Sequence, residues 1–265
     1  ISEEIKKGFK KKRIEKTTED FKKDNKKINN QFDFKNKIEL HEIDYYYPDS
    51  KIKIIDKLSL QISFGEVIGI IGQSGAGKST LIDLIIGLLT PSSGKILIDG
   101  KNIGLEKQNW QKQIGYIPQE IYLFDDTIKS NIAFGIPENK INHNNLKEAI
   151  KLAELEKFIE SLPDKENTII GDRGTKLSGG QKQRIGIARS LYFKPKILIF
   201  DEPTSSLDVK NEGKIMNQIF NLSGDLTILI ISHRLSILKD CNKIVNLVHG
   251  KIDKISTYKS LLNNN

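Results

Sequence analysis

Eight consecutive residues, GQSGAGKS at 72–79, constrain most strongly what this chain can fold into. They follow a short apolar stretch, Glu66–Ile71, that predicts a strand, and they lead into a helix predicted over Lys78–Leu88. Glycines let the backbone curl so that successive N–H groups point at an anion, and the positive end of the following helix strengthens that field. The Lys78 ammonium can reach the β- and γ-phosphates of a nucleotide, and the Ser79 hydroxyl can ligate Mg²⁺. The residues expected to contact a nucleotide are Gly72, Gln73, Ser74, Gly75, Ala76, Gly77, Lys78, Ser79 and Thr80.

The other apolar stretches indicate an α/β fold. KIELHEIDYYYP and KLSLQISF are rich in β-branched and aromatic residues, which is typical of strands in an antiparallel layer. Lys196–Phe200 and Leu226–Ile231 are continuous apolar runs, as expected for strands covered on both faces. Further strands are expected at Ile96–Ile98 and Ile114–Ile117, with mostly helical structure from Asp126 to about Phe193. We therefore predict an α/β core with an antiparallel layer and an inserted helical subdomain at about 119–193.

Two carboxylates, Asp201 and Glu202, directly follow the apolar run Lys196–Phe200. In open α/β sheets, ligands bind beyond the carboxyl ends of the strands, which is where these side chains would emerge. Asp201 suits Mg²⁺ coordination through water, and Glu202 suits polarising a water for attack on a γ-phosphate. An Asp-Glu pair at a strand end is often only a solvated terminus, but the phosphate loop upstream favours the functional interpretation.

A second glycine-containing motif is Leu177–Gln181, LSGGQ, followed by a helical apolar pattern in KQRIGIARSL. Ser-Gly-Gly ahead of a helix offers free N–H groups and a hydroxyl at a positive helix end. Taken alone, this motif predicts no more than a helix N-cap with flexible glycines. Beside a phosphate loop, it becomes a second candidate anion site.

Most of the positive charge lies in the first thirty residues. The chain has 265 residues and a net charge of +8, and residues 1–30 hold ten Lys and one Arg against six acidic residues, a net charge of +5. This tail is either a solvated helix followed by a linker or a juxtamembrane segment that contacts anionic lipid headgroups. No aromatic-studded basic face accompanies it, so we expect no nucleic-acid partner. The single cysteine, Cys241, excludes a disulfide scaffold and a multi-cysteine metal site.

The phosphate loop, LSGGQ and Asp201-Glu202 together resemble the ATPase domain of an ABC transporter. LSGGQ is the signature of that family and stands here without substitution, and the resemblance covers roughly residues 37–260. It implies a P-loop NTPase (RecA-like) core with an antiparallel β layer and an inserted helical signature subdomain. The ATPase domain would span 37–265, after a basic linker, 1–36, that follows a membrane domain outside this chain. The activity implied is ATP hydrolysis, with ATP and Mg²⁺ bound.

The resemblance assigns further residues one at a time. Tyr47, just before Pro48, matches the aromatic residue on which adenine stacks, with Tyr46 as the alternative. Gln119 matches the glutamine that contacts Mg²⁺ and water, and His233 matches the histidine that contacts the γ-phosphate. The catalytic residues expected are Glu202, His233 and Gln119, and the Mg²⁺ ligands expected are Ser79, Gln119 and Asp201. The residues expected to contact ATP bound to a second domain are Ser178, Gly179, Gly180, Gln181 and Asp208.

In this family two ATPase domains pack head-to-tail, so that each ATP lies between Lys78 of one and Ser178–Gly180 of the other. We expect a homodimer at the cytoplasmic face of the membrane, with a transmembrane domain fused at the N-terminus. The segment Thr168–Gly174 resembles the exporter type, although Asp172 replaces the more usual Glu, and Trp110–Gln119 is most like bacterial exporters and flippases. Pro203 stands where exporters more often carry Ala. A separate ATPase subunit of an importer and a non-transport ABC ATPase remain alternatives.

Overall fold

The structure is a computed structural model that describes residues 33–202, 209–232 and 234–262. Phe34–Asn265 forms one compact unit, which begins three residues before the domain boundary predicted at 37. Asp208 and His233, two of the predicted site residues, lie outside the described residues.

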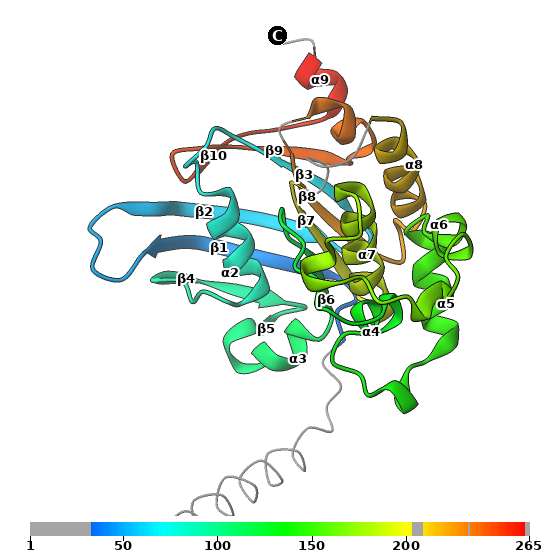
Figure 1. The fold of residues 1–265 in the computed structure, drawn as a ribbon. Helices are drawn as coiled ribbons and strands as arrows, with labels where there is room; N and C mark the ends of the chain where they lie inside the picture. The colour runs from blue at the N-terminus through cyan, green and yellow to red at the C-terminus, as the bar shows by residue number, and fades with distance from the viewer. Residues whose placement is uncertain (1–32, 203–208, 233, 263–265) are drawn as a thin grey trace, which may run out of the picture. The chain divides into compact units, whose positions relative to one another are not determined.

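Two sheets organise this unit (Figure 1). The first is antiparallel, in the order β2-β1-β4-β5, and the second has the order β10-β9-β3-β8-β7-β6. In the second sheet β9, β3, β8, β7 and β6 are parallel and β10 is antiparallel to β9. The strands are β1 (Lys37–Tyr46), β2 (Lys53–Ser63), β3 (Val67–Ile71), β4 (Ser93–Ile98), β5 (Lys101–Asn102), β6 (Ile114–Ile117), β7 (Ile197–Asp201), β8 (Thr227–Ile231), β9 (Lys243–Val248) and β10 (Lys251–Ser256).

The helices separate into groups around the sheets (Figure 1). Helix α2 follows β3 directly, whereas α4 to α7 gather on the side away from the antiparallel sheet. Helix α7 packs against α4, α5 and β6, which fixes the helical segment to the edge of the parallel sheet. The helices are α2 (Lys78–Ile86), α3 (Lys107–Gln111), α4 (Ile128–Ile132), α5 (His143–Leu152), α6 (Glu156–Glu160), α7 (Gly179–Tyr192), α8 (Val209–Phe220) and α9 (Tyr258–Leu262).

The central parallel strands explain why the site forms where it does. All five residues of β8 are buried, as are the first four of β3 and of β7, so apolar burial on both faces holds these strands at the centre of the sheet. Because β3, β8, β7 and β6 are neighbours and parallel, their carboxyl ends share one edge. Segments that follow Ile71, Phe200, Ile231 and Ile117 therefore meet there, although they are far apart in the sequence.

The predicted α/β architecture, with an antiparallel layer and a helical segment, is confirmed. The predicted strand at 114–117 matches β6 in both bounds, and the one at Glu66–Ile71 differs from β3 by one residue. The helix predicted to reach Leu88 ends at Ile86, because Gly87 takes a left-handed conformation with φ 79° and caps it. Strands β9 and β10 were not predicted individually, and β9 completes the parallel sheet beside β3.

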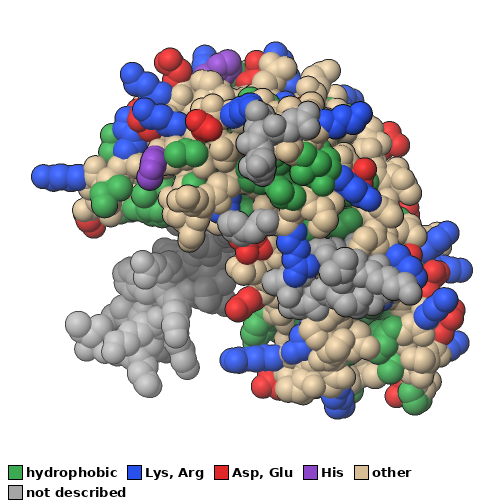
Figure 2. Space-filling view, turned by 90° about the horizontal axis from the view of Figure 1, so that it is seen from above, with side chains coloured by type: hydrophobic (Ala, Val, Ile, Leu, Met, Phe, Trp, Pro, Cys, Tyr) green, Lys and Arg blue, Asp and Glu red, His purple; other side chains and the backbone are tan. Residues whose placement is uncertain are grey.

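The surface carries interspersed charges. Figure 2 shows Lys and Arg side chains with Asp and Glu among them over the face that it presents. Among the residues that the structure describes, no helix combines the length and the apolar character needed to cross a bilayer.

Candidate nucleotide-binding and catalytic site

The phosphate loop, residues 72–77, turns sharply between β3 and α2. Gly72 has φ 152° and Gly77 has φ 98°, values that side chains with a Cβ rarely adopt. A Cβ at Gly72 would collide with the carbonyl oxygen of Leu247, and one at Gly77 would lie 3.0 Å from the Ile54 carbonyl oxygen. Neighbouring backbone therefore excludes a side chain at Gly72 and leaves little room for one at Gly77, where the left-handed φ also disfavours it.

The Lys78 side chain lies inside the curve of this loop. It is only 8% exposed, and its Nζ donates hydrogen bonds to the carbonyl oxygens of Gly72, at 2.9 Å, and Gln73, at 3.0 Å. Its charge is therefore held among the backbone groups that would surround a phosphate. An incoming phosphate would have to replace these carbonyls as the partner of the ammonium group.

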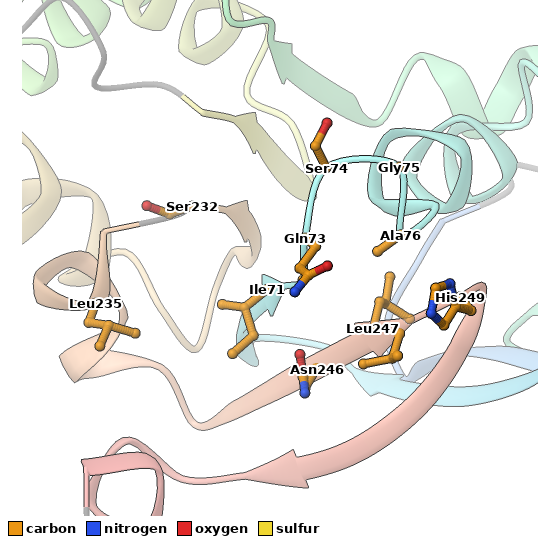
Figure 3. A pocket seen from close by; sticks show the side chains of 12 residues that line it. Ile71, Gln73, Ser74, Gly75, Ala76, Ser232, Leu235, Asn246, Leu247 and His249 are labelled. Carbon is orange, nitrogen blue, oxygen red and sulfur yellow. The ribbon is translucent and has the colours of Figure 1, made fainter. Parts of the chain in front are cut away.

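A cavity of about 560 Å³ borders the phosphate loop (Figure 3). Ser232 and Leu235, which follow β8, face Ile71 and Gln73 across it. The opposite wall comes from the end of β9 and the turn after it, including Asn246 and His249. His249 is exposed and lines this cavity.

Of the three consecutive tyrosines, Tyr47 is the one joined to the phosphate-loop helix. Its hydroxyl lies 3.1 Å from Thr80 Oγ1, and its ring is 42% exposed. Tyr45 is buried and packs edge-to-face against Tyr47, with ring centroids 5.2 Å apart. Tyr46 turns instead toward Lys53, whose Nζ lies 5.6 Å from the ring centroid. This arrangement favours Tyr47 over Tyr46 as the stacking residue.

The two predicted carboxylates emerge at the end of β7. Asp201 Oδ2 accepts a hydrogen bond from the Tyr116 hydroxyl at 3.1 Å, and Glu202 Oε2 accepts one from Gln119 Nε2 at 3.3 Å. The structure thus brings together Gln119 and Glu202, which are 83 positions apart. Glu202 has φ 50°, an unfavourable value for a residue with a side chain, and its N–H donates to the Ile231 carbonyl oxygen at 3.1 Å.

The acidic groups at this edge share an electrostatic environment that favours a cation. Burial raises the pKa of Asp201, the nearby Glu202 carboxylate raises it further, and the Tyr116 hydrogen bond and the Lys78 charge act the other way. Burial also raises the pKa of Asp83 in α2, with a further contribution from Asp201. Negative charges that repel one another in a partly desolvated place are stabilised by a bound cation.

Tyr116 and Asp83 were not identified as site residues from the sequence. Tyr116 lies on β6, which pairs with β7, and Tyr116 is aligned with Ile199 in that ladder. Only strand pairing brings its hydroxyl to Asp201, and no local sequence pattern reports such pairing. Asp83 is the one charged residue within the apolar run Leu81–Ile86 of α2, a signal in the sequence that could have drawn attention to it.

The LSGGQ segment forms the start of α7. The Ser178 hydroxyl accepts a hydrogen bond from the Gln181 N–H at 3.3 Å, and the Ser178 N–H donates to Gln181 Oε1 at 2.8 Å. This reciprocal capping leaves Ser178 and Gly179 exposed at the positive end of a 14-residue helix. The Gln181 side chain, predicted to contact nucleotide, has its amide oxygen bound to its own cap.

Known proteins resemble this chain in sequence. The model of the family described as ABC transporter matches residues 55–205. The toxin RTX-I translocation ATP-binding protein of Actinobacillus pleuropneumoniae is 44% identical over 221 residues, which cover 82% of this chain and 30% of that protein. A putative export ATP-binding/permease protein of Rickettsia typhi is 42% identical over 229 residues, or 86% of this chain and 39% of that protein.

A solved structure resembles the chain as well. A bacterial Atm1-family ABC exporter with ATP bound superposes with a TM-score of 0.80 and 35% identity, over 87% of this chain and 40% of that chain. The chain therefore spans well under half of the length of the proteins that it matches.

Proposed function

The chain belongs to the ABC transporter family as an ATP-hydrolysing domain, and from that premise we propose that it powers an exporter or flippase through ATP-driven, head-to-tail pairing of two such domains. The observation that carries the proposal is the carboxyl edge of the parallel sheet. There the phosphate loop with Lys78 follows β3, and the hydrogen-bonded residues Glu202 and Gln119 follow β7 and β6 of the same sheet. A triphosphate held by the loop would present its terminal phosphate toward that pair.

The proposed roles follow from chemistry and position. Lys78 and the N–H groups of 72–80 bind the phosphates, and Tyr47 stacks on the base. The Glu202 carboxylate orients and polarises the attacking water, and Gln119 holds that carboxylate and the water in place. His233 is proposed to contact the γ-phosphate, although it lies outside the described residues.

The donor set fits Mg²⁺ as a further ligand. Ser79, Gln119 and Asp201 offer a hydroxyl, an amide and a carboxylate oxygen, the hard donors that Mg²⁺ prefers. In the part of the chain that the structure describes, no cluster of three or more His, Cys, Asp or Glu could form an all-protein metal cage. Mg²⁺ binding needs none, because this ion keeps several waters and binds through one or two protein oxygens plus substrate phosphates. When bound, it would neutralise charge on the phosphates.

Head-to-tail pairing is supported by the exposed cap of α7. Ser178 presents its hydroxyl and Gly179 its backbone N–H at a positive helix end, a suitable site for a phosphate bound to another domain. Asp208, proposed to act across the same interface, lies outside the described residues. Two identical sites under one two-fold axis would form an isologous homodimer held together by ATP.

A membrane partner is supported by an exposed aromatic face, defined by Tyr122, Phe124 and Phe134. These rings are 55%, 43% and 47% exposed. Phe124 stacks on Phe134 with centroids 4.8 Å apart and meets Tyr122 edge-to-face at 5.1 Å. Ordered aromatic rings left exposed together favour a docking surface. The basic segment before Phe34 would connect the ATPase domain, at the cytoplasmic face, to a membrane domain fused before it.

The test is Glu202→Gln, which keeps the shape and the contact with Gln119 but removes the charge. ATP turnover should fall by about 10²-fold or more, while Mg-ATP still binds and an ATP-bound dimer accumulates. Glu160→Gln at the exposed end of α6 makes the same chemical change away from the site and should leave turnover intact. Turnover that survives in Glu202→Gln would refute the assignment of Glu202.

A further inference from the structure

Arg189, on α7, binds the chain segment that follows Gln119. Its Nε donates to the Asn131 carbonyl oxygen at 2.8 Å, one terminal nitrogen donates to the Tyr122 carbonyl oxygen at 2.8 Å, and the other donates to Asn131 Oδ1 at 3.1 Å. The guanidinium carbon also lies 5.3 Å from the ring centroid of Phe134. One side chain therefore contacts α4, the segment after Gln119 and the aromatic face.

Asn131 completes this connection from the other side. Its side chain is 1% exposed. Its Oδ1 accepts the Phe124 N–H, and its Nδ2 donates to the carbonyl oxygens of Phe124 and Thr127, each at 3.0 Å. Asn131 thus closes the turn that carries Phe124, and Arg189 fixes Asn131 to α7. All the groups that hold the guanidinium here are neutral, and burial lowers the pKa of Arg189.

The connection joins two parts of the proposed mechanism. Gln119, which hydrogen-bonds to Glu202, precedes Tyr122 by three residues. Arg189 lies eleven residues after Ser178 on one uninterrupted helix, or roughly 16 Å along its axis at 1.5 Å per residue. A helix in a close-packed interior moves as a rigid body, because the packing around it resists small deformations along its length. A shift of the segment at Tyr122 would therefore reach the exposed cap at Ser178.

We propose that Arg189 is a positioning residue that makes the segment after Gln119, the aromatic face and the LSGGQ loop move as one body. The state of the Gln119–Glu202 pair then governs how Ser178–Gly180 is presented to a second domain. This inference rests on the proposed function, because it assumes that Ser178–Gly180 binds ATP held by that second domain. Arg189 does not touch nucleotide in this scheme.

The experiment uses the whole 265-residue chain with Glu202→Gln, to which Arg189→Ala or Arg189→Lys is added. Self-association with and without Mg-ATP is measured by sedimentation, and ATP affinity of the monomer by titration with a fluorescent nucleotide. We expect Arg189→Ala to weaken ATP-dependent association about tenfold, because the hydrogen bonds of the charged guanidinium are lost. The ATP affinity of the monomer should not change, because the phosphate loop is not altered. Millimolar guanidinium should restore part of the association in Arg189→Ala, which a general loss of folding would not permit.

Arg184→Ala is the matched control. Arg184 lies on the same helix and donates to a backbone carbonyl, that of Glu154, at 3.0 Å. Among the residues that the structure describes, Arg184 makes no hydrogen bond to the segment after Gln119, so its removal should leave association unchanged. Equal weakening by Arg184→Ala and Arg189→Ala, without rescue by guanidinium, would overturn the inference.

Hydrogen exchange separates this inference from the proposed function. In the Glu202→Gln parent, ATP should change the exchange of residues 121–132 and 178–183 together, and in Arg189→Ala the change at 178–183 should be lost. If the Glu202→Gln parent does not self-associate when ATP is present, the proposed pairing of two domains fails. Hydrogen exchange in the monomer still decides the role of Arg189 in that case. If ATP still changes the exchange of 121–132 and 178–183 together in Arg189→Ala, the inference is wrong. If Arg189→Ala does not fold, Arg189→Lys, which keeps the charge but not the planar fork, decides by the same comparison.

Discussion

Phe34 should contribute strongly to the stability of the ATPase domain, although it lies before the boundary predicted at 37. The side chain is 0% exposed, and it packs edge-to-face against Phe64 and Trp110, with ring centroids 5.3 Å and 5.6 Å away. Its N–H donates to Gln113 Oε1 at 2.9 Å. The N–H groups of the next three residues donate to the Asp99 carboxylate at 2.8, 2.9 and 2.7 Å. The segment is therefore attached through both its ring and its backbone.

Phe34→Ala should lower the free energy of unfolding by about 3–5 kcal/mol, the usual cost of emptying a buried phenylalanine site. About 0.5–1.5 kcal/mol of this would come from each edge-to-face ring contact. The lower end of the range is expected, because the start of a folded unit can relax more easily than its centre. For a domain of this size, a loss of 3 kcal/mol corresponds to a fall in Tm of roughly 6–12 °C.

Urea unfolding is the assay, because Trp110 is the only tryptophan of the chain and its fluorescence reports on this cluster. Circular dichroism should follow the same transition. Phe193→Ala is the control, since this ring is 48% exposed at the end of α7, and it should cost less than about 1 kcal/mol. A loss below about 1 kcal/mol for Phe34→Ala would refute the reasoning and favour a domain that begins at 37.

Two further predictions concern the site. In a fluorescent-nucleotide titration, Tyr47→Ala should weaken ATP binding by about 1–3 kcal/mol, the contribution of one base–aromatic stack. Tyr47→Phe loses only the contact with Thr80, so it and Tyr46→Ala should have small effects. Equal losses for Tyr46→Ala and Tyr47→Ala would contradict the assignment of Tyr47. Asp201→Asn should stabilise the domain without nucleotide or Mg²⁺ at pH 8 by at most about 1 kcal/mol, because the carboxylate is half-buried and solvent screens part of the penalty. The pKa of Asp201 is raised in the folded state, so folding disfavours its charge above that pKa and the penalty disappears as the pH falls through it. Thermal unfolding at pH 8 and pH 5 measures this, and a variant advantage that grows at pH 5 would be inconsistent with the raised pKa.

Local sequence determined the parts of the site that depend on the backbone itself. The phosphate loop could be predicted because glycine alone tolerates the dihedral angles at Gly72 and Gly77, and Ser178 because a hydroxyl before a helix caps it. The strands β3, β7 and β8 could be predicted because burial on both faces requires continuous apolar runs. In each case the physical cause acts within a few neighbouring residues, so the pattern is visible in the sequence.

Tertiary structure alone decided which of these parts meet. Gln119 contacts Glu202, Tyr116 contacts Asp201, and Arg189 binds Asn131, although the residues of each pair lie between 58 and 85 positions apart. No local pattern in the sequence signals such contacts, because strand order in the sheet and the packing of α7 arise from burial summed over the whole core. The same holds for Phe34, whose ring packs against Phe64 and Trp110 and whose N–H binds Gln113, contacts that no local pattern predicts.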